Sequence, residues 1–243
     1  SCGHDMHMAV WTGTARALAK RKNEWSGTVL MIGQPAEEIG AGAAMMLNEG
    51  LYEKFPIPDY GIGLHSSPII PSGKVGFGKG YTMANTESVD IKIYGQGAHG
   101  ASPHMSIDPI VTASLIVMEL QTIVSRNINP IDDAVITVGS INGGTKHNII
   151  PDEVNLQLTI RTYKDEVRKL IHKRIKEICN GIASSMGLDK SRWPEVIIPD
   201  NYTPANYNDE KLVDIMVDVS ESVLGKENVI NSEPQMVGED FAR

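Results

Sequence analysis

Residues 28–40 read TVLMIGQPAEEIG and place two adjacent carboxylates directly after an apolar run. The run from Thr28 to Ile32 is β-branched and aliphatic, which predicts a buried strand. The small residues from Ala41 to Leu47 predict the first turns of a helix. Glu37 and Glu38 would then lie at the carboxyl end of a strand, where open α/β sheets bind their ligands. A solvated pair at a helix start, favoured by the helix dipole, is the alternative.

Residues that commonly bind transition metals stand on both sides of this segment. Cys2 and His4 lie upstream, and His65 lies downstream after a short apolar run. Cys2 and His4 are two residues apart, so they would point the same way in an extended or loop conformation. Thiolate, imidazole and carboxylate groups are the expected ligands of such a site. The alternatives are a chance Cys-His pair in a loop, or a ligand pair formed by His4 and His7.

Size and charge exclude several classes of protein. The chain has 243 residues, enough for one large domain or two modest ones. Its formal net charge is −8 with no basic block, so neither nucleic acid nor a membrane surface is an expected partner. The longest mostly apolar run, Ile110 to Leu120, falls far short of the roughly 20 residues that span a bilayer. Cys179 is expected in the core of a helix-packed domain, not in a disulfide framework.

The ends of the sequence indicate a piece of a longer protein. The first residue is not Met, and Arg243 follows the motif-like stretch 238–242 without a terminal signal. We expect a cytoplasmic protein, although a signal peptide upstream of the first residue is left open.

The order of predicted elements indicates two domains. A helix from about Asp5 to Arg21, the strand, a second helix and a short strand at 59–64 predict an α/β domain. It would have a mainly parallel sheet with helices on both faces. This domain would comprise residues 1–81 and 201–243, incomplete at both ends, because a further helix is predicted near its C-terminal part. Residues 82–200 would form an inserted α+β domain.

The inserted domain is predicted to be ferredoxin-like. Alternating apolar residues mark its strands, and the order of elements is strand, helix, strand, strand, helix, strand. Asp108 followed by Pro109 is a typical helix start. The predicted elements are a strand at 89–94, a helix from 108 to about 125, strands at 134–141 and 153–161, a helix at 167–186 and a strand at 195–198.

Together, the motifs resemble those of the M20 metallopeptidase superfamily from one end of the chain to the other. Residues 1–5 (SCGHD), 34–38 (QPAEE) and 63–65 (GLH) are similar to its metal motifs. The Cys-Gly-His-Asp form resembles the amidohydrolase branch, which contains hippurate hydrolases, N-acyl-amino-acid amidohydrolases and auxin-conjugate hydrolases. Further stretches that resemble this branch are GAHGASPH at 97–104 with DP at 108–109, NIIPD at 148–152 and GEDF at 238–241.

The resemblance implies a two-metal hydrolase. By motif position, Cys2, His4, Glu38 and His65 would bind two divalent metal ions, and Glu37 would act as general base on a water activated by them. The ligand types favour Zn²⁺ or Mn²⁺ and also admit Co²⁺ or Ni²⁺. The family's last ligand is a histidine well beyond the Gly-Glu-Asp-Phe stretch, so it would lie outside this chain.

The resemblance also assigns the inserted domain a role as lid and as the interface of a homodimer. His99 would be the lid histidine that reaches the active site of the neighbouring subunit. Asn148 and Arg161 are candidates for binding the substrate's carboxylate or its scissile carbonyl. Their alternatives are a turn-capping Asn and a solvated Arg at a strand end.

Three hypotheses about function follow. The leading one is a metal-dependent amidohydrolase that cleaves a small N-acyl amino acid into a carboxylate and an amino acid. The second is an amidase with Cys2 as nucleophile and His4 or His65 as base. The third is a non-catalytic dimeric binding protein that retains the fold.

Overall fold

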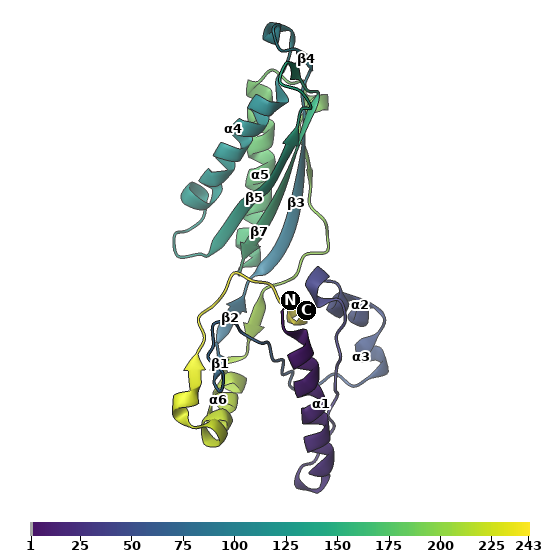
Figure 1. Cartoon of the computed structure of the whole chain (residues 1–243), viewed down its shortest axis with the longest axis vertical. Helices are drawn as coiled ribbons and strands as arrows, with labels where there is room; N and C mark the ends of the chain where they lie inside the picture. The colour runs from purple at the N-terminus through teal and green to yellow at the C-terminus, as the bar shows by residue number, and fades with distance from the viewer. Residues whose placement is uncertain (1) are drawn as a thin grey trace. The chain divides into compact units, whose positions relative to one another are not determined.

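The computed structural model describes residues 2–243 and divides the chain into two compact units (Figure 1). The first unit comprises the residues up to Gly80, together with Asn208–Glu233 and Arg243. The second comprises Tyr81–Tyr207 and Pro234–Ala242. Each unit therefore contains segments that are far apart in the sequence.

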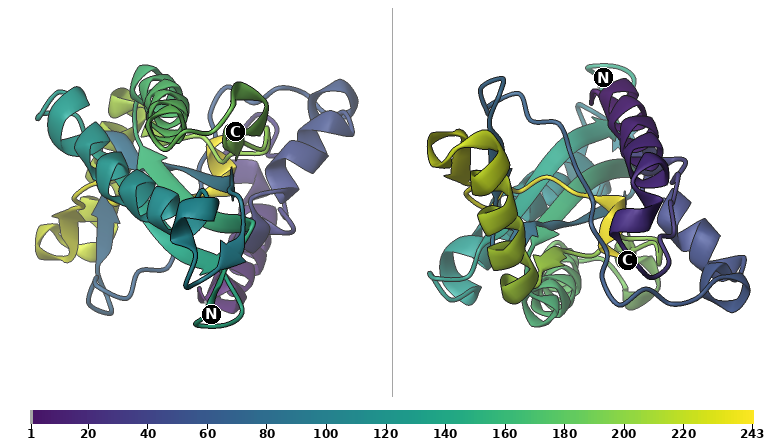
Figure 2. Two further views of the ribbon diagram at one scale, coloured as in Figure 1. Left: turned by 90° about the horizontal axis from the view of Figure 1, so that it is seen from above. Right: turned by 90° about the horizontal axis from the view of Figure 1, so that it is seen from below.

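The second unit has a four-stranded antiparallel sheet in the order β5-β7-β3-β8. Helices α4 and α5 contact each other and the sheet, and they lie side by side on one of its faces (Figures 1 and 2). This is a ferredoxin-like arrangement. The elements in chain order are β3 (Asn85–Tyr94), α4 (Pro109–Thr122), β5 (Ala134–Gly143), β7 (Glu153–Thr162), α5 (Asp165–Ser185) and β8 (Glu195–Ile197).

Buried and exposed side chains alternate along the strands, and the buried ones form the core of this unit. Every second side chain of β7, from Val154 to Thr162, is buried against the two helices. The Asp108 carboxylate caps α4 by accepting hydrogen bonds from the next free backbone N–H groups, those of Ile110 and Val111. Cys179 is fully buried in this core, and its burial raises the pKa of the thiol to about 12, so it is an inert packing residue as expected.

Residues 234–242 contact the second unit, although the sequence pattern groups them with the metal-bearing domain. The backbone N–H of Ala84 donates to the carbonyls of Gln235 and Val237 at 3.2 and 2.9 Å. The Arg161 guanidinium donates to the Met236 carbonyl at 2.9 Å. These hydrogen bonds hold residues 235–237 beside Ala84 and Arg161 of the second unit.

The first unit consists mainly of helices. They are α1 (His4–Lys20), α2 (Gly42–Asn48), α3 (Leu51–Lys54) and α6 (Glu210–Leu224). Strands β1 (Val75–Phe77) and β10 (Val229–Asn231) form a parallel pair. Two further short pairs lie wholly or mostly in the second unit, where β2 (Gly80–Met83) pairs with β9 (Asn206–Asn208) and β4 (Ala98–His99) pairs with β6 (Ile149–Ile150).

The described residues are α/β, as expected, but the mainly parallel sheet predicted for the first unit is not formed by them. Residues 28–32 and 59–64 have no strand partner within the described part of the chain. The Ile32 carbonyl instead accepts a hydrogen bond from the Trp11 indole at 3.1 Å. A strand requires a neighbour that supplies the other half of its hydrogen bonds, and the prediction was wrong because no described segment supplies it.

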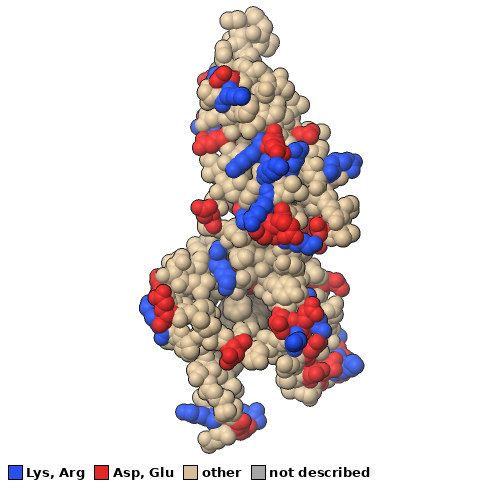
Figure 3. Space-filling view, turned by 180° about the vertical axis from the view of Figure 1, so that it is seen from behind, with Lys and Arg blue, Asp and Glu red and all other residues tan. Residues whose placement is uncertain are grey.

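Charged side chains of both signs lie on the surface of the described residues (Figure 3). On the face that Figure 3 shows, acidic side chains lie among the basic ones, in keeping with 22 Lys and Arg residues against 30 Asp and Glu residues. Among residues 2–243, none of the helices combines the length and the apolarity of a membrane span.

Candidate metal centre

The two adjacent carboxylates lie in a short, constrained turn of the first unit. Glu37 and Glu38 begin the 3₁₀ turn Glu37–Ile39, which is flanked by Ala36 and Gly40 in the left-handed conformation, with φ of 53° and 60°. Within residues 2–243, Ala36 is the one non-glycine residue with positive φ. Such a conformation costs on the order of 1–3 kcal/mol and is common at functional sites. The strain fixes the direction in which the two carboxylates leave the backbone.

Close packing behind this turn keeps it in place. A Cβ atom added to Gly42 would lie 1.5 Å from the Pro35 carbonyl oxygen, so α2 begins directly against the backbone that precedes the acidic pair. A larger residue at position 42 would push the turn away. Glycine is therefore needed here for space.

The Cys2-Gly3-His4 segment lies at the start of α1, near the acidic pair. Gly3 adopts φ of 71° and ψ of 27° as the N-cap of α1, and His4 is the first residue of that helix. Of the extended and loop conformations expected for this segment, the structure has a left-handed turn at Gly3. Because α1 begins at His4, His7 lies one turn further along the same face.

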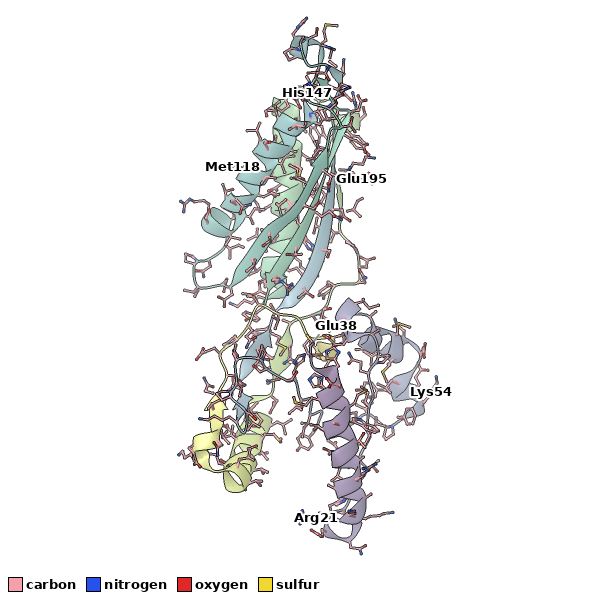
Figure 4. All side chains as sticks on the ribbon, in the orientation of Figure 1. Arg21, Glu38, Lys54, Met118, His147 and Glu195 are labelled. Atoms are coloured by element: carbon pink, nitrogen blue, oxygen red, sulfur yellow. The ribbon has the colours of Figure 1, made fainter. Side chains whose placement is uncertain are left out.

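Five predicted site residues converge in this unit. One ligand atom each of Cys2, His4 and His65 lie within 4.8 Å of one another, and the same holds for His4, Glu37 and Glu38. The His4 Nε2 atom is 3.5 Å from a Glu37 carboxylate oxygen and 3.8 Å from one of Glu38. Glu38 is labelled beside the first turn of α1 in Figure 4. The two groups share His4, so the five side chains form one continuous cluster.

The hydrogen bond of His65 sets the tautomer of its ring. Its Nδ1 atom lies 2.6 Å from the Ser66 carbonyl oxygen. A carbonyl can only accept, so Nδ1 carries the proton and the neutral ring keeps a lone pair on Nε2. Histidines that bind metals usually donate their other ring N–H to a carbonyl or a carboxylate in this way.

His7 lies among the same rings but uses Nε2 differently. Its ring centroid is 4.7 Å from that of His65 and 5.2 Å from that of His4. Its Nε2 atom accepts a hydrogen bond from the Ser66 backbone N–H at 2.8 Å. That bond occupies the lone pair that a metal would need, which disfavours the competing ligand pair of His4 and His7.

The electrostatics of the site fit a divalent cation. The charge of Glu38 is the largest cause of a raised pKa at the Cys2 thiol, followed by desolvation and by the charge of Glu37. A thiol in such surroundings stays protonated until a cation offsets the carboxylates. The donor set of one thiol, two imidazoles and two carboxylates suits a transition metal, so the residues present fit the implied ions.

A comparison with known families agrees with this geometry. The model of the peptidase family M20/M25/M40 matches residues 1–243. The chain belongs to this family.

Two named relatives and one solved structure are similar to this chain over nearly its whole length. The chain is 38% identical over 243 residues to an N-acetyl-L-cysteine deacetylase of Bacillus subtilis (strain 168), covering 100% of this chain and 56% of that protein. It is 37% identical over 242 residues to a hippurate hydrolase of Campylobacter jejuni, covering 99% of this chain and 61% of that protein. A solved dinuclear metal binding peptidase of the M20 family from Bacillus subtilis has a TM-score of 0.76 at 31% identity, over 99% and 59% of the two chains. This chain thus spans about 60% of their length.

The remaining candidate residues of this M20 chain lie in the second unit. His99 in β4 pairs with Ile149 in β6, and the Asn148 carbonyl accepts from the Gly100 N–H at 2.8 Å, so His99 and Asn148 are neighbours. Arg161 lies elsewhere. It pairs with Thr86 at the other end of β3, and the eight steps from Thr86 to Tyr94 span about 26 Å.

The His99 ring is held as a hydrogen-bond donor. Its Nδ1 atom accepts from the Ala101 backbone N–H at 3.1 Å. In the neutral ring the proton is therefore on Nε2. His99 is exposed, and Nε2 is at the end of its side chain. An N–H group of this kind can stabilise an oxyanion.

The pKa shift of Cys2 gives a prediction that needs no metal. Glu38→Gln removes the largest cause of the raised pKa, so the pKa of Cys2 in the metal-free protein should fall. The thiolate is the reactive form, and alkylation by iodoacetamide at neutral pH should therefore become faster. Glu53→Gln in α3 is the charge-matched control, and buried Cys179 contributes no fast phase. If Glu38→Gln left the rate of Cys2 alkylation at neutral pH unchanged, Glu38 would not lie close to Cys2.

Proposed function

We propose that the whole protein is a metal-dependent amidohydrolase that cleaves the amide bond of N-acyl amino acids. The observation that carries this proposal is the convergence of Cys2, His4, Glu37, Glu38 and His65 in the first unit. The names of the two hydrolase relatives support the substrate class.

In this proposal Cys2, His4, Glu38 and His65 hold two divalent ions. The proximity of Glu38 to the Cys2 thiol supports Glu38, not Glu37, as the carboxylate that shares an ion with the thiolate. Zn²⁺ and Mn²⁺ suit the donors best, and Co²⁺ or Ni²⁺ also suit them. The dinuclear metal binding relative supports the number of ions.

The protein's own groups would move the proton. Bound divalent ions supply Lewis-acid activation of water and of the carbonyl. Glu37 takes a proton from the attacking water as its oxygen bonds to the amide carbon. Glu37 then gives that proton to the leaving nitrogen as the C–N bond breaks, which yields a carboxylic acid and a free amino acid; the acid gives its own proton to solvent and becomes a carboxylate. The His99 Nε2–H would donate to the developing oxyanion, and Asn148 and Arg161 would bind the substrate's polar ends.

We further propose that the second unit is an inserted lid and the interface of a homodimer. The outer side of α4 is apolar and exposed at Val111, Leu115 and Met118, the last of them 73% exposed (Figure 4). β5 is an edge strand of the sheet, with backbone groups available on one side. A two-fold dimer would cover both features at once, since each subunit offers the same surface. Asn148 and His99 would then enter the partner's site together.

The cysteine amidase is the weaker alternative. A nucleophilic cysteine needs a depressed pKa and a nearby base. The carboxylates around Cys2 raise its pKa instead. His65 belongs to the same cluster of possible metal ligands as Cys2, which suits a cation as well as a base.

The decisive test is hydrolysis of acetyl-, benzoyl- and indoleacetyl-amino acids by the purified whole protein. We expect turnover of at least one class, its loss on dialysis against a chelator, and its return with Zn²⁺ or Mn²⁺. Activity that survives the chelator and is stopped by a thiol alkylator would favour the cysteine amidase. Tight binding of these compounds without metal and without turnover would favour the binding protein.

A further inference from the structure

Ser66 connects three segments of the candidate metal centre. Its hydroxyl donates to the Cys2 carbonyl at 2.7 Å, and its backbone N–H donates to the His7 Nε2 atom at 2.8 Å. Its carbonyl accepts from the His65 Nδ1–H at 2.6 Å. The His7 Nε2 atom also lies 3.3 Å from the Ser66 hydroxyl. One residue therefore bonds to the chain before α1, to α1 itself and to the neighbouring ligand residue.

Gly3 brings the two backbones together. A Cβ atom added to Gly3 would lie 2.8 Å from the Ser66 hydroxyl oxygen, and the φ of Gly3 is left-handed at +71°. Glycine is needed here for both reasons. The turn that links Cys2 to His4 thus packs directly against Ser66.

His7 and Ser66 contribute in different ways. The Ser66 hydroxyl fixes the peptide that follows Cys2, and so the direction of the thiol. His7 fixes the backbone of Ser66, and so the carbonyl that orients the His65 ring. The bonds run between residues that are 59 and 64 positions apart in the sequence, so neither is a by-product of local helix or turn geometry.

We propose that Ser66 and His7 are positioning residues that hold Cys2 and His65 at ligand spacing around the metal ions. The proposal rests on the function proposed above. Neither residue would touch an ion or the substrate. Groups that orient metal ligands from behind typically change metal affinity about 10–100-fold when removed.

The test is a metal titration of the metal-free whole protein. Zn²⁺ affinity is measured by competition with a chromophoric chelator for wild type, Ser66→Ala, His7→Leu and His7→Gln. We expect Ser66→Ala and His7→Leu to bind Zn²⁺ about 10–100-fold more weakly than wild type. His7→Gln should bind within a few-fold of wild type, because its amide oxygen can accept from the Ser66 N–H in place of Nε2.

Matched controls separate positioning from loss of structure. Ser67→Ala removes the neighbouring hydroxyl, which accepts from the Ile69 N–H at 3.4 Å, and should leave Zn²⁺ affinity unchanged. Thermal melting of each metal-free variant should match that of metal-free wild type.

The outcomes distinguish this proposal from the function beneath it. If wild type binds Zn²⁺ and both Ser66→Ala and His7→Leu bind it equally well, the positioning role is wrong and the metal centre stands. If His7→Gln binds as weakly as His7→Leu, His7 does not act through its acceptor atom. If wild type itself binds no divalent ion, the proposed function fails, and the positioning role fails with it.

Discussion

Replacing Glu37 by Gln is expected to lower turnover by roughly 10²–10⁴-fold, the usual effect of losing a general base, while metal content stays near that of wild type. Gln has nearly the same shape as Glu but cannot take a proton from water. Glu38→Gln should instead lose metal, because a carboxylate oxygen is replaced by a neutral amide beside the Cys2 thiol.

Elemental analysis of the two purified variants, together with their kcat values, separates the roles. The two residues are adjacent, and both lie within 4 Å of the His4 ring nitrogen. The substitutions are also identical in kind, so each variant is the control for the other. Metal loss in Glu37→Gln with full occupancy in Glu38→Gln would reverse the assignment of base and ligand.

Local patterns were sufficient to predict the strands and helices around the four-stranded sheet of the second unit. Its strands alternate between buried and exposed residues, and Asp108 with Pro109 marks the start of α4. Each of these signals is read within about ten residues and agrees with the long-range pairing. The strand predicted at 28–32 depends instead on partners elsewhere, and an apolar run cannot say whether a partner exists.

The candidate metal centre could also be predicted only in part from local sequence. Residue types and spacing identified the five groups that converge, because a thiol, imidazoles and paired carboxylates have few other uses together. The left-handed Ala36 and the bonds of Ser66 had no sequence signal, since both arise from backbone positions. The 26 Å or so between Arg161 and the His99 end of the sheet follows only from strand register.

That separation bears on the catalytic role proposed for His99. His99 and Arg161 lie at opposite ends of β3, so a single rigid copy of this unit cannot place both against one small substrate. An N-acyl amino acid is much shorter than the length of a ten-residue strand. The proposed second subunit would resolve the conflict, because a two-fold dimer could present the His99 end of one copy to the other.

Subunit mixing tests this directly. His99→Ala and Glu37→Gln proteins, each nearly inactive alone, are unfolded or dissociated together in equal amounts and allowed to reassociate. Random pairing makes half of the dimers mixed, and each mixed dimer has one site with both Glu37 and His99 intact. The mixture should therefore regain about a quarter of wild-type activity, measured against wild type taken through the same steps.

The size of the recovery is informative because other arrangements predict other values. If His99 acts on the Glu37 of its own chain, every site in a mixed dimer carries one defect and the mixture stays inactive. A mixture of His99→Ala with wild-type protein is the matched control. Acting in trans or within one chain, His99→Ala should leave that control at about half of wild-type activity, so it reports how much active protein survives the procedure without favouring either model. Heterodimers that form, as shown by a tag on one variant, but restore nothing would remove His99 from the partner's site.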